Sequence, residues 1–180
     1  METRYFLFLP LLMSLGTAST LAVADQICDA AYPMSIQAGR FKDNGDGTLT
    51  DSQSGLTWMR CALGQNWTGA TCVGKLDTYT WQSAQDMASK LDKMGGYAGH
   101  NDWRVPQIPE LAMIVERQCA NPRINLALFP TTPATYFWTA TTRRGRGMEA
   151  EAYVLSFGPE GAGHKDKGDA HYVRLVRDGK

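Results

Sequence analysis

The clearest periodic pattern in the chain is a helical one over residues 80–94. Apolar residues recur there at helical spacing, at Trp81, Ala84, Met87, Ala88, Leu91 and Met94. Polar residues fill most of the positions between them, and Gly95-Gly96 follows as a helix stop. The pattern predicts an amphipathic helix over residues 80–94 that buries its apolar face against the core.

A second, shorter helix is expected to begin at Pro109, because proline is favoured in the first turn of a helix. Leu111, Ile114 and Val115 give this segment an apolar side. We expect the helix to pack on the core through that side.

Short runs of β-branched and aromatic residues predict the strands. The predicted strands cover residues 40–43, 48–51, 56–60, 136–139, 152–157 and 172–177. Asn44-Gly45-Asp46-Gly47 separates the first two, and these residue types supply the positive φ angles of a tight hairpin turn. Two helices among short antiparallel hairpin strands indicate an α+β fold in a single compact domain.

The acidic residues around this turn, Asp43, Asp46 and Asp51, also raise the alternative of a calcium loop. An EF-hand loop takes oxygen ligands at its first, third and fifth positions. Counted from Asp43, the third and fifth positions are Gly45 and Gly47, which have no side chain to offer. A turn is therefore favoured over a calcium site, and no metal or cofactor is predicted.

The N-terminal residues have the layout of a secretory signal peptide. An apolar run over residues 5–15 leads to the small residues Ala22-Val23-Ala24. The run is shorter than the roughly 20 residues that span a bilayer. We expect residues 1–24 to be removed, leaving a lead-in over residues 25–39 and one domain over residues 40–180. The mature chain is then exported without membrane insertion, to the periplasm or surface of a bacterium.

Composition and motifs argue against several classes of function. The chain has 18 basic and 18 acidic residues and no net charge, which argues against a basic nucleic-acid-binding protein. No G-x-S-x-G motif, phosphate-binding glycine loop or pair of histidine ligands occurs. His100, His164 and His171 are scattered in turn-like surroundings, which is typical of solvated surface histidines. No catalytic residue is therefore predicted.

All four cysteines follow the predicted cleavage site, at Cys28, Cys61, Cys72 and Cys119. Four cysteines allow three pairings, and exported proteins favour disulfides. Cys61 and Cys72 flank a polar stretch with no core of its own, so we expect these two to form one bridge and Cys28 to pair with Cys119. A metal site is the alternative, but no C-x-x-C spacing is present.

The densest polar and aromatic cluster is Asp102-Trp103-Arg104-Val105-Pro106, with Glu110 behind it. One interpretation makes Arg104 and Glu110 a clamp for a ligand. We favour a structural role, in which Trp103 anchors the core and Arg104 pairs with Glu110 or Asp102. A buried guanidinium group needs such a partner.

The other tryptophans divide into two groups. Trp58, Trp81 and Trp138 lie within apolar patterns and are expected in the core. Trp67 lies in the polar stretch between Cys61 and Cys72. It is the candidate exposed aromatic contact to a ligand, and the alternative is that it packs its own loop.

The candidate ligand-binding cations are Arg143, Arg144, Arg146, Lys165 and Lys167. The arginines are expected on a loop between two strands, and the lysines on the next loop, in a glycine-rich stretch. If both loops emerge at one end of the sheet, these cations can bind sulfate or carboxylate groups, with arginine binding in a bidentate manner. The alternative is an ordinary solvated surface that Glu149, Glu151 and Asp166 neutralise.

A series of blocks along the chain resembles the Lcl C-terminal domain family, a group of bacterial exported domains. The blocks are residues 40–51, 55–61, 64–67 with Cys72, 102–106 with Glu110-Leu111, 121–125, 129–130, 138–141 and 172–177. They occur in order and run from about Arg40 to Arg177.

The resemblance implies a binding domain. The family's named member is a surface adhesin whose terminal domain is associated with sulfated-polysaccharide and host-matrix binding. That member carries a collagen-like stalk, whereas this chain has no Gly-X-Y repeat. A looser similarity to the C-type lectin-like and formylglycine-generating-enzyme architecture implies a C-type lectin-like fold. The enzyme activity does not carry over, because those enzymes use cysteines near their C-terminus and here none follows Cys119.

We therefore expect an exported, non-catalytic, adhesin-like binding module. Its expected partner is a glycan, such as a sulfated polysaccharide, or an envelope or surface protein, and not a nucleic acid. One alternative is a structural component of a surface assembly such as a pilus or secretion system. An enzyme acting on the envelope is a less favoured alternative.

Overall fold

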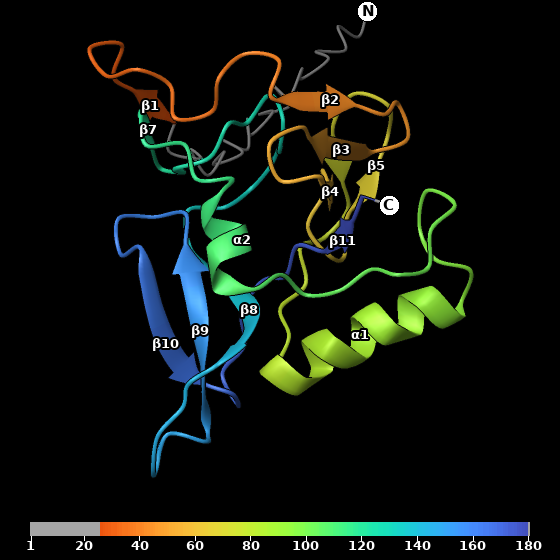
Figure 1. Cartoon of the computed structure of the whole chain (residues 1–180), viewed down its shortest axis with the longest axis vertical. Helices are drawn as coiled ribbons and strands as arrows, with labels where there is room; N and C mark the ends of the chain where they lie inside the picture. The colour runs from red at the N-terminus through yellow and green to blue at the C-terminus, as the bar shows by residue number, and fades with distance from the viewer. Residues whose placement is uncertain (1–25, 180) are drawn as a thin grey trace, which may run out of the picture.

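The predicted hairpin at the start of the domain becomes part of a four-stranded antiparallel sheet. The computed structural model describes residues 26–179. β2 (Phe41–Asp43) and β3 (Thr48–Asp51) pair across the predicted turn, and β4 (Leu56–Met59) and β11 (Val176–Asp178) complete the order β11-β4-β3-β2 (Figure 1). Gly47 closes the turn with a φ of 88°. A Cβ atom there would lie 2.9 Å from Cβ of Trp67, so the position requires glycine.

The second sheet has the order β10-β9-β8, with β8 at Tyr136–Thr142, β9 at Glu151–Ser156 and β10 at Ala162–Asp166. The strands β8 and β9 confirm the sequence prediction. The expectation of a loop around Lys165 is wrong, because residues 162–166 pair in continuous register with β9. Glycine and charged residues have low strand propensity, and pairing along the free edge of β9 overrides it.

Two short ribbons complete the strands. β1 (Ile27–Cys28) pairs with β7 (Cys119–Ala120), and β5 (Asn66–Trp67) pairs with β6 (Cys72–Val73). Both predicted disulfides are confirmed: Cys28 is bonded to Cys119, and Cys61 is bonded to Cys72. Each bridge therefore holds a ribbon too short to be stable by itself.

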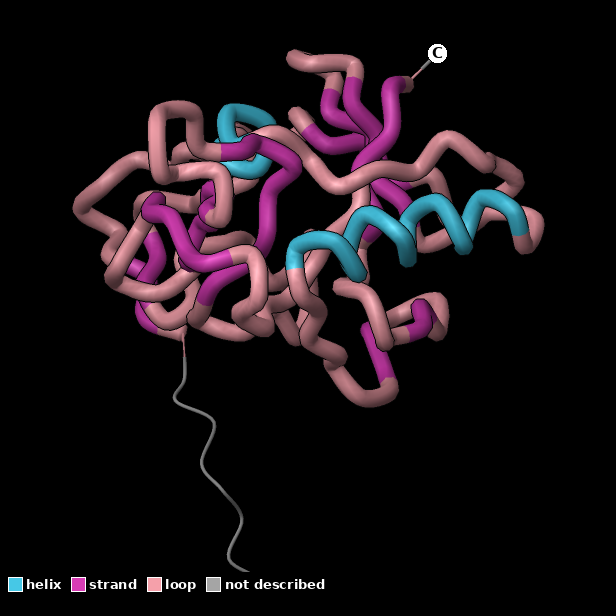
Figure 2. The backbone as a smooth tube through the Cα atoms, turned by 90° about the horizontal axis from the view of Figure 1, so that it is seen from below, coloured by secondary structure: helices cyan, strands magenta, loops and turns pink. Residues whose placement is uncertain are grey.

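The two helices lie at separate places on the domain (Figure 2). α1 (Trp81–Lys93) packs against β8 and confirms the prediction, with the Thr80 side chain capping its first turn. Met94, expected on the apolar face, is 75% exposed because the helix ends before it. α2 (Ile108–Ala112) is shorter than expected, so Ile114 is buried just beyond the helix.

The predicted strand over residues 172–177 is regular only in β11, because its first part bonds to several segments in turn. The carbonyl of Tyr172 accepts from the amide of Trp138 at 2.9 Å, and the carbonyl of Val173 accepts from Leu63 at 2.9 Å. The carbonyl of Leu175 accepts from Met59 at 3.2 Å. This C-terminal segment therefore links the two sheets.

Arg174 lies in the middle of the C-terminal segment and is completely buried. Its guanidinium group donates to the carbonyl of Met59 at 2.9 Å, to the carbonyl of Arg60 and to the hydroxyl of Thr132 at 2.7 Å. The ring of Phe129 lies 4.9 Å from the guanidinium carbon. Burial lowers the pKa of Arg174 to about 9, so the group is charged at neutral pH and is stabilised by oxygen dipoles and a π face.

Arg174→Met is expected to destabilise the protein by about 3 kcal/mol, because methionine keeps apolar contacts but leaves buried carbonyls without a donor. Urea unfolding at pH 7 measures the change. The control Arg144→Met, at an exposed position, is expected to change stability by less than about 0.5 kcal/mol. Equal stabilities of the two variants would contradict the role of Arg174.

Residues 26–39, here named the strap, cross one end of the domain. Gln26 donates from its side chain to the carbonyls of Pro122 and Ile124, both at 2.6 Å. The disulfide at Cys28 and the burial of Ile36 add two further attachments. The expected lead-in is thus attached to the domain at several points, although most of its residues are exposed. The predicted signal peptide lies outside the described residues, and no helix in residues 26–179 is long and apolar enough to cross a membrane.

The buried carboxylate of Glu116 forms hydrogen bonds with the strap. Its two oxygens accept from the amides of Ser35 at 2.8 Å and Ile36 at 3.0 Å, and from its near neighbour Gln118 at 3.0 Å. Burial by itself would raise the pKa of Glu116, and these backbone donors instead hold it below its usual value. The ionised carboxylate therefore stabilises the attachment of the strap.

Glu116→Gln is expected to cost about 2 kcal/mol at pH 7, because the amide cannot accept from all three donors. Since the pKa of Glu116 is lower in the folded protein, its stabilisation is complete above the unfolded value of about 4.3. It is lost as the pH falls through the folded value. Urea unfolding should therefore show a smaller difference between the two proteins at pH 3 than at pH 6. A difference that does not change with pH would contradict this account.

Candidate functional site

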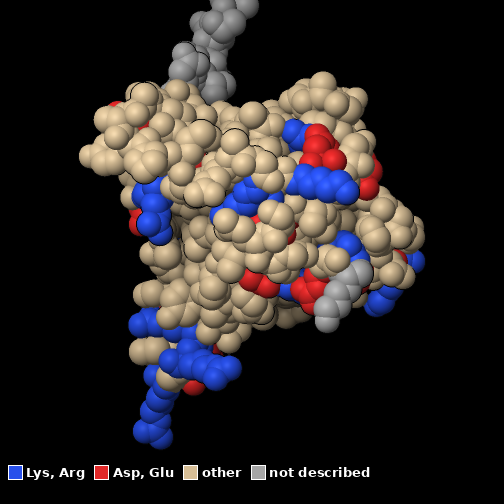
Figure 3. All heavy atoms as spheres, turned by 45° about the horizontal axis from the view of Figure 1, so that its top comes forward, with Lys and Arg blue, Asp and Glu red and all other residues tan. Residues whose placement is uncertain are grey.

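The structure brings the backbones of all five candidate cations to one end of the second sheet, although the Lys165 ammonium extends over Tyr136, which begins β8 at the opposite end. β8 ends at Thr142 and β10 ends at Asp166, where they pair with Ala152 and Glu151 at the start of β9. The segments that follow β8 and β10 therefore emerge together, and Figure 3 shows Lys and Arg gathered there, at the lower left, with few acidic atoms. We name this surface the basic end; it consists of Arg143, Arg144, Arg146, Lys165 and Lys167.

Two lysines of the basic end lie over aromatic rings. Lys165 is 4.7 Å from the ring of Tyr136, and Lys167 is 4.7 Å from the ring of Trp81. Lys167 also donates to the carbonyl of Glu149 at 2.6 Å. The sequence did not predict these aromatic partners, because each ring lies far from its lysine along the chain.

The expected neutralisation by acidic residues is partial. Glu151 forms an ion pair with Arg143 and lies 3.2 Å from His164, and the hydrogen bond from Arg143 lowers the pKa of Glu151. The Asp166 carboxylate instead accepts from the amide of Gly168. Within residues 26–179, neither Glu149 nor Asp166 forms an ion pair.

Arg144 and Arg146 are the exposed members of the basic end. In the described part of the chain neither guanidinium group has an ion-pair or hydrogen-bond partner. Their donors are therefore available to an anionic ligand, and Arg143 beside them is tied to Glu151. This arrangement can bind a sulfate or carboxylate group through bidentate hydrogen bonds.

The ion pair predicted between Arg104 and Glu110 is present. The Arg104 guanidinium group donates to both oxygens of Glu110, at 2.7 and 2.8 Å, and to Asp178 at 2.7 Å. Burial would raise the pKa of Glu110, and the bonds from Arg104 and the Gln107 amide instead lower it. The expected alternative partner of Arg104, Asp102, pairs with Arg177 at 2.6 Å.

The tryptophans expected in the core are placed there for the most part. Trp58, Trp103 and Trp138 are buried, whereas Trp81 is half-buried and donates its indole N–H to Thr139 at 2.9 Å. Trp67 is also half-buried, with the guanidinium carbon of Arg60 at 4.1 Å from its ring. The ring therefore packs locally, and a ligand contact at its exposed part stays a prediction.

The acidic residues of the first hairpin each bind a different partner. Asp43 pairs with Arg60, Asp46 accepts from Thr48, and Asp51 pairs with Arg40. Residues 26–179 contain no group of three or more His, Cys, Asp or Glu side chains that could hold a metal ion. The three histidines lie on separate elements, and burial lowers the pKa of His171, which packs edge-on against Tyr136 and Trp138.

Comparison with known proteins identifies a family. No curated protein matches the chain. The pattern described as the Lcl C-terminal domain matches residues 47–177, which is most of the chain. The match includes the whole β10-β9-β8 sheet, both helices, the basic end and all of the four-stranded sheet except β2 and the last residue of β11. The protein therefore belongs to the Lcl C-terminal domain family.

Proposed function

We propose that this protein is an exported, non-catalytic binding module that recognises an anionic polysaccharide through its basic end. The observation that carries the proposal is the position of Arg144 and Arg146. Both are exposed, both follow Arg143 in the segment after β8, and neither has a partner in the described part of the chain. Exposed guanidinium groups beside one another suit a repeating array of sulfate or carboxylate groups.

The surroundings of the basic end support a polysaccharide ligand. Lys165 and Lys167 are held over Tyr136 and Trp81, so these charges lose little conformational freedom on binding. The basic end lies on an edge of the domain instead of in an enclosed cavity (Figure 3). A long chain can run across such a surface. Two disulfides in the structure are in keeping with export.

The double variant Arg144→Ala/Arg146→Ala is expected to weaken binding to heparin at least tenfold at low salt, because it removes the two unpaired guanidinium groups. Retention on immobilised heparin and calorimetric titration with a heparin oligosaccharide measure the change. Raising the salt concentration should weaken binding of the unaltered protein, since exposed charges are screened.

The matched control is Lys90→Ala/Lys93→Ala, which removes two exposed cations from the last turn of α1. It lowers the net charge by the same amount and should change heparin binding less than twofold. Equal losses in both double variants would show that only net charge matters. No binding by the unaltered protein would reject an anionic glycan as the ligand and favour a protein partner within a surface assembly.

A further inference from the structure

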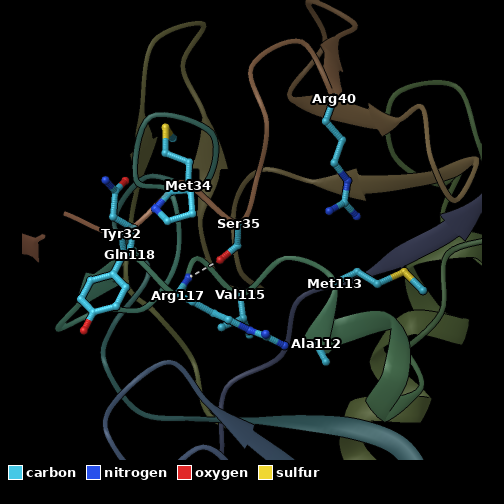
Figure 4. A pocket seen from close by; sticks show the side chains of 10 residues that line it. Tyr32, Met34, Ser35, Arg40, Ala112, Met113, Val115, Arg117 and Gln118 are labelled. Atoms are coloured by element: carbon cyan, nitrogen blue, oxygen red, sulfur yellow. Dashed lines mark hydrogen bonds between the residues drawn. The ribbon is translucent and has the colours of Figure 1, made fainter. Parts of the chain in front are cut away.

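A cavity lies at the strap, away from the basic end. Its volume is about 530 Å³, and strap residues 32–35, Arg40 and residues between 112 and 118 line it. We name it the strap groove (Figure 4). In Figure 1 the ribbon of β1 and β7 beside it lies at the top, and the loop between β8 and β9 lies at the bottom. The two surfaces are therefore independent.

Much of the exposed apolar surface gathers at this groove. Six large apolar residues are exposed in the described part of the chain, and three of them line the strap groove: Tyr32 at 64%, Met34 at 47% and Met113 at 40%. Exposed apolar residues that gather within a polar rim mark an interaction site. Two of the three are methionines, whose flexible side chains adapt to different ligand shapes.

Two arginines line the strap groove, and Arg117 carries its uncompensated charge, because Arg40 is ion-paired with the buried Asp51. Figure 4 shows Arg40 reaching in from the start of β2 and Arg117 extending along the opposite side. No aspartate or glutamate lines the groove. The carboxylate of the adjacent Glu116 is buried and accepts from backbone amides. The groove is therefore complementary to a negatively charged group.

The two guanidinium groups differ in how they are held. Arg40 donates two hydrogen bonds to Asp51, at 2.9 and 2.6 Å, and its side chain is only 11% exposed. Its position is therefore fixed before a ligand binds. Arg117 is exposed, and within residues 26–179 its guanidinium group has no ion-pair or hydrogen-bond partner. Its only bond in this region comes from its backbone amide, which donates to the Ser35 hydroxyl.

The lining favours a peptide over a lipid or a bare anion. Ser35, Gln118 and Tyr32 add polar groups between the apolar ones. These groups can form hydrogen bonds with a peptide backbone, whereas an alkyl chain offers them no partner. An inorganic anion would leave the methionines exposed. We propose that the strap groove binds a short segment of a partner protein in which a carboxylate lies next to an apolar side chain. Arg117 binds the carboxylate, and Met34 and Met113 contact the apolar side chain.

The strap groove is only partly covered by the family pattern. The pattern matches residues 47–177, whereas residues 32–35 and Arg40 precede it. Half of the groove therefore comes from residues outside the matched part. The disulfide at Cys28 and the clamp at Glu116 hold that half in place.

Selection from a phage-displayed library of random octapeptides on the purified protein tests the proposal. The enriched peptides are expected to carry Asp or Glu within two positions of Leu, Ile, Met or Phe. The tightest one, made synthetically, should bind Arg117→Ala at least tenfold more weakly than the unaltered protein. Changing the peptide's acid to its amide should weaken binding to the unaltered protein and leave binding to Arg117→Ala unchanged, since both changes break the same ion pair.

Three controls separate peptide binding in the strap groove from binding at the basic end and from a loss of folding. Arg144→Ala/Arg146→Ala should bind the peptide as the unaltered protein does. Met113→Ala should weaken binding about threefold or more through lost apolar contact, with no change in heparin retention. Thermal unfolding should be unchanged in Arg117→Ala, because only the backbone of Arg117 bonds to the strap; if it is lowered, Arg117→Gln replaces it in the same comparison.

The proposal is overturned if no peptide is enriched, if the enriched peptides lack an acidic residue, or if Arg117→Ala and Arg117→Gln both bind them unchanged. It is also overturned if the peptides lose binding to Arg144→Ala/Arg146→Ala, which would place them on the basic end. Heparin binding is measured separately, so either proposal can fail while the other holds.

Discussion

The packing of both sheets depends on one buried charge, the guanidinium group of Arg174. It comes from the segment that links the sheets, and it donates to carbonyls where β4 ends and to Thr132. A buried cation without such acceptors would carry a large free-energy penalty. The fold must therefore place these acceptors, at the end of β4 and at Thr132, around the C-terminal segment that carries Arg174. The C-terminal segment, last along the chain, is in this way fixed at the centre of the fold.

Ion pairs around the core also fix the positions of segments, although each pair includes a side chain less buried than that of Arg174. Asp51 is buried and binds Arg40, and Arg104 joins Glu110 to Asp178 near the end of the chain. Each pair fixes the approach of two segments that are distant in sequence or belong to different elements. Arginines dominate because the planar guanidinium group can bind several oxygens at once. Arginines that retain unused donors, such as Arg144 and Arg117, lie where the chain meets solvent.

The two proposed binding surfaces differ in character and lie at different ends of the domain. The basic end combines loop residues with Lys165 of β10, its charge exceeds what its acidic neighbours pair, and it suits a long anionic chain. The strap groove is concave and partly apolar, and Arg117 carries its unpaired charge while Arg40 is paired with Asp51. These features suit a short peptide segment. A module that holds a polysaccharide at one end and a protein at the other would connect an envelope or surface protein to a glycan, as an accessory adhesin must.

The sequence alone determined the elements whose information is local. The helical period of residues 80–94, the turn glycines and the pairing of Cys61 with Cys72 depend on neighbours along the chain, and each prediction was correct in outline. It also identified the cations of the basic end. Only the tertiary structure decided the edge strand β10, the aromatic partners of the lysines, the burial of Arg174 and the groove at Arg117. Each of these depends on contacts between residues far apart in sequence, for which hydrophobic pattern and residue type carry no signal.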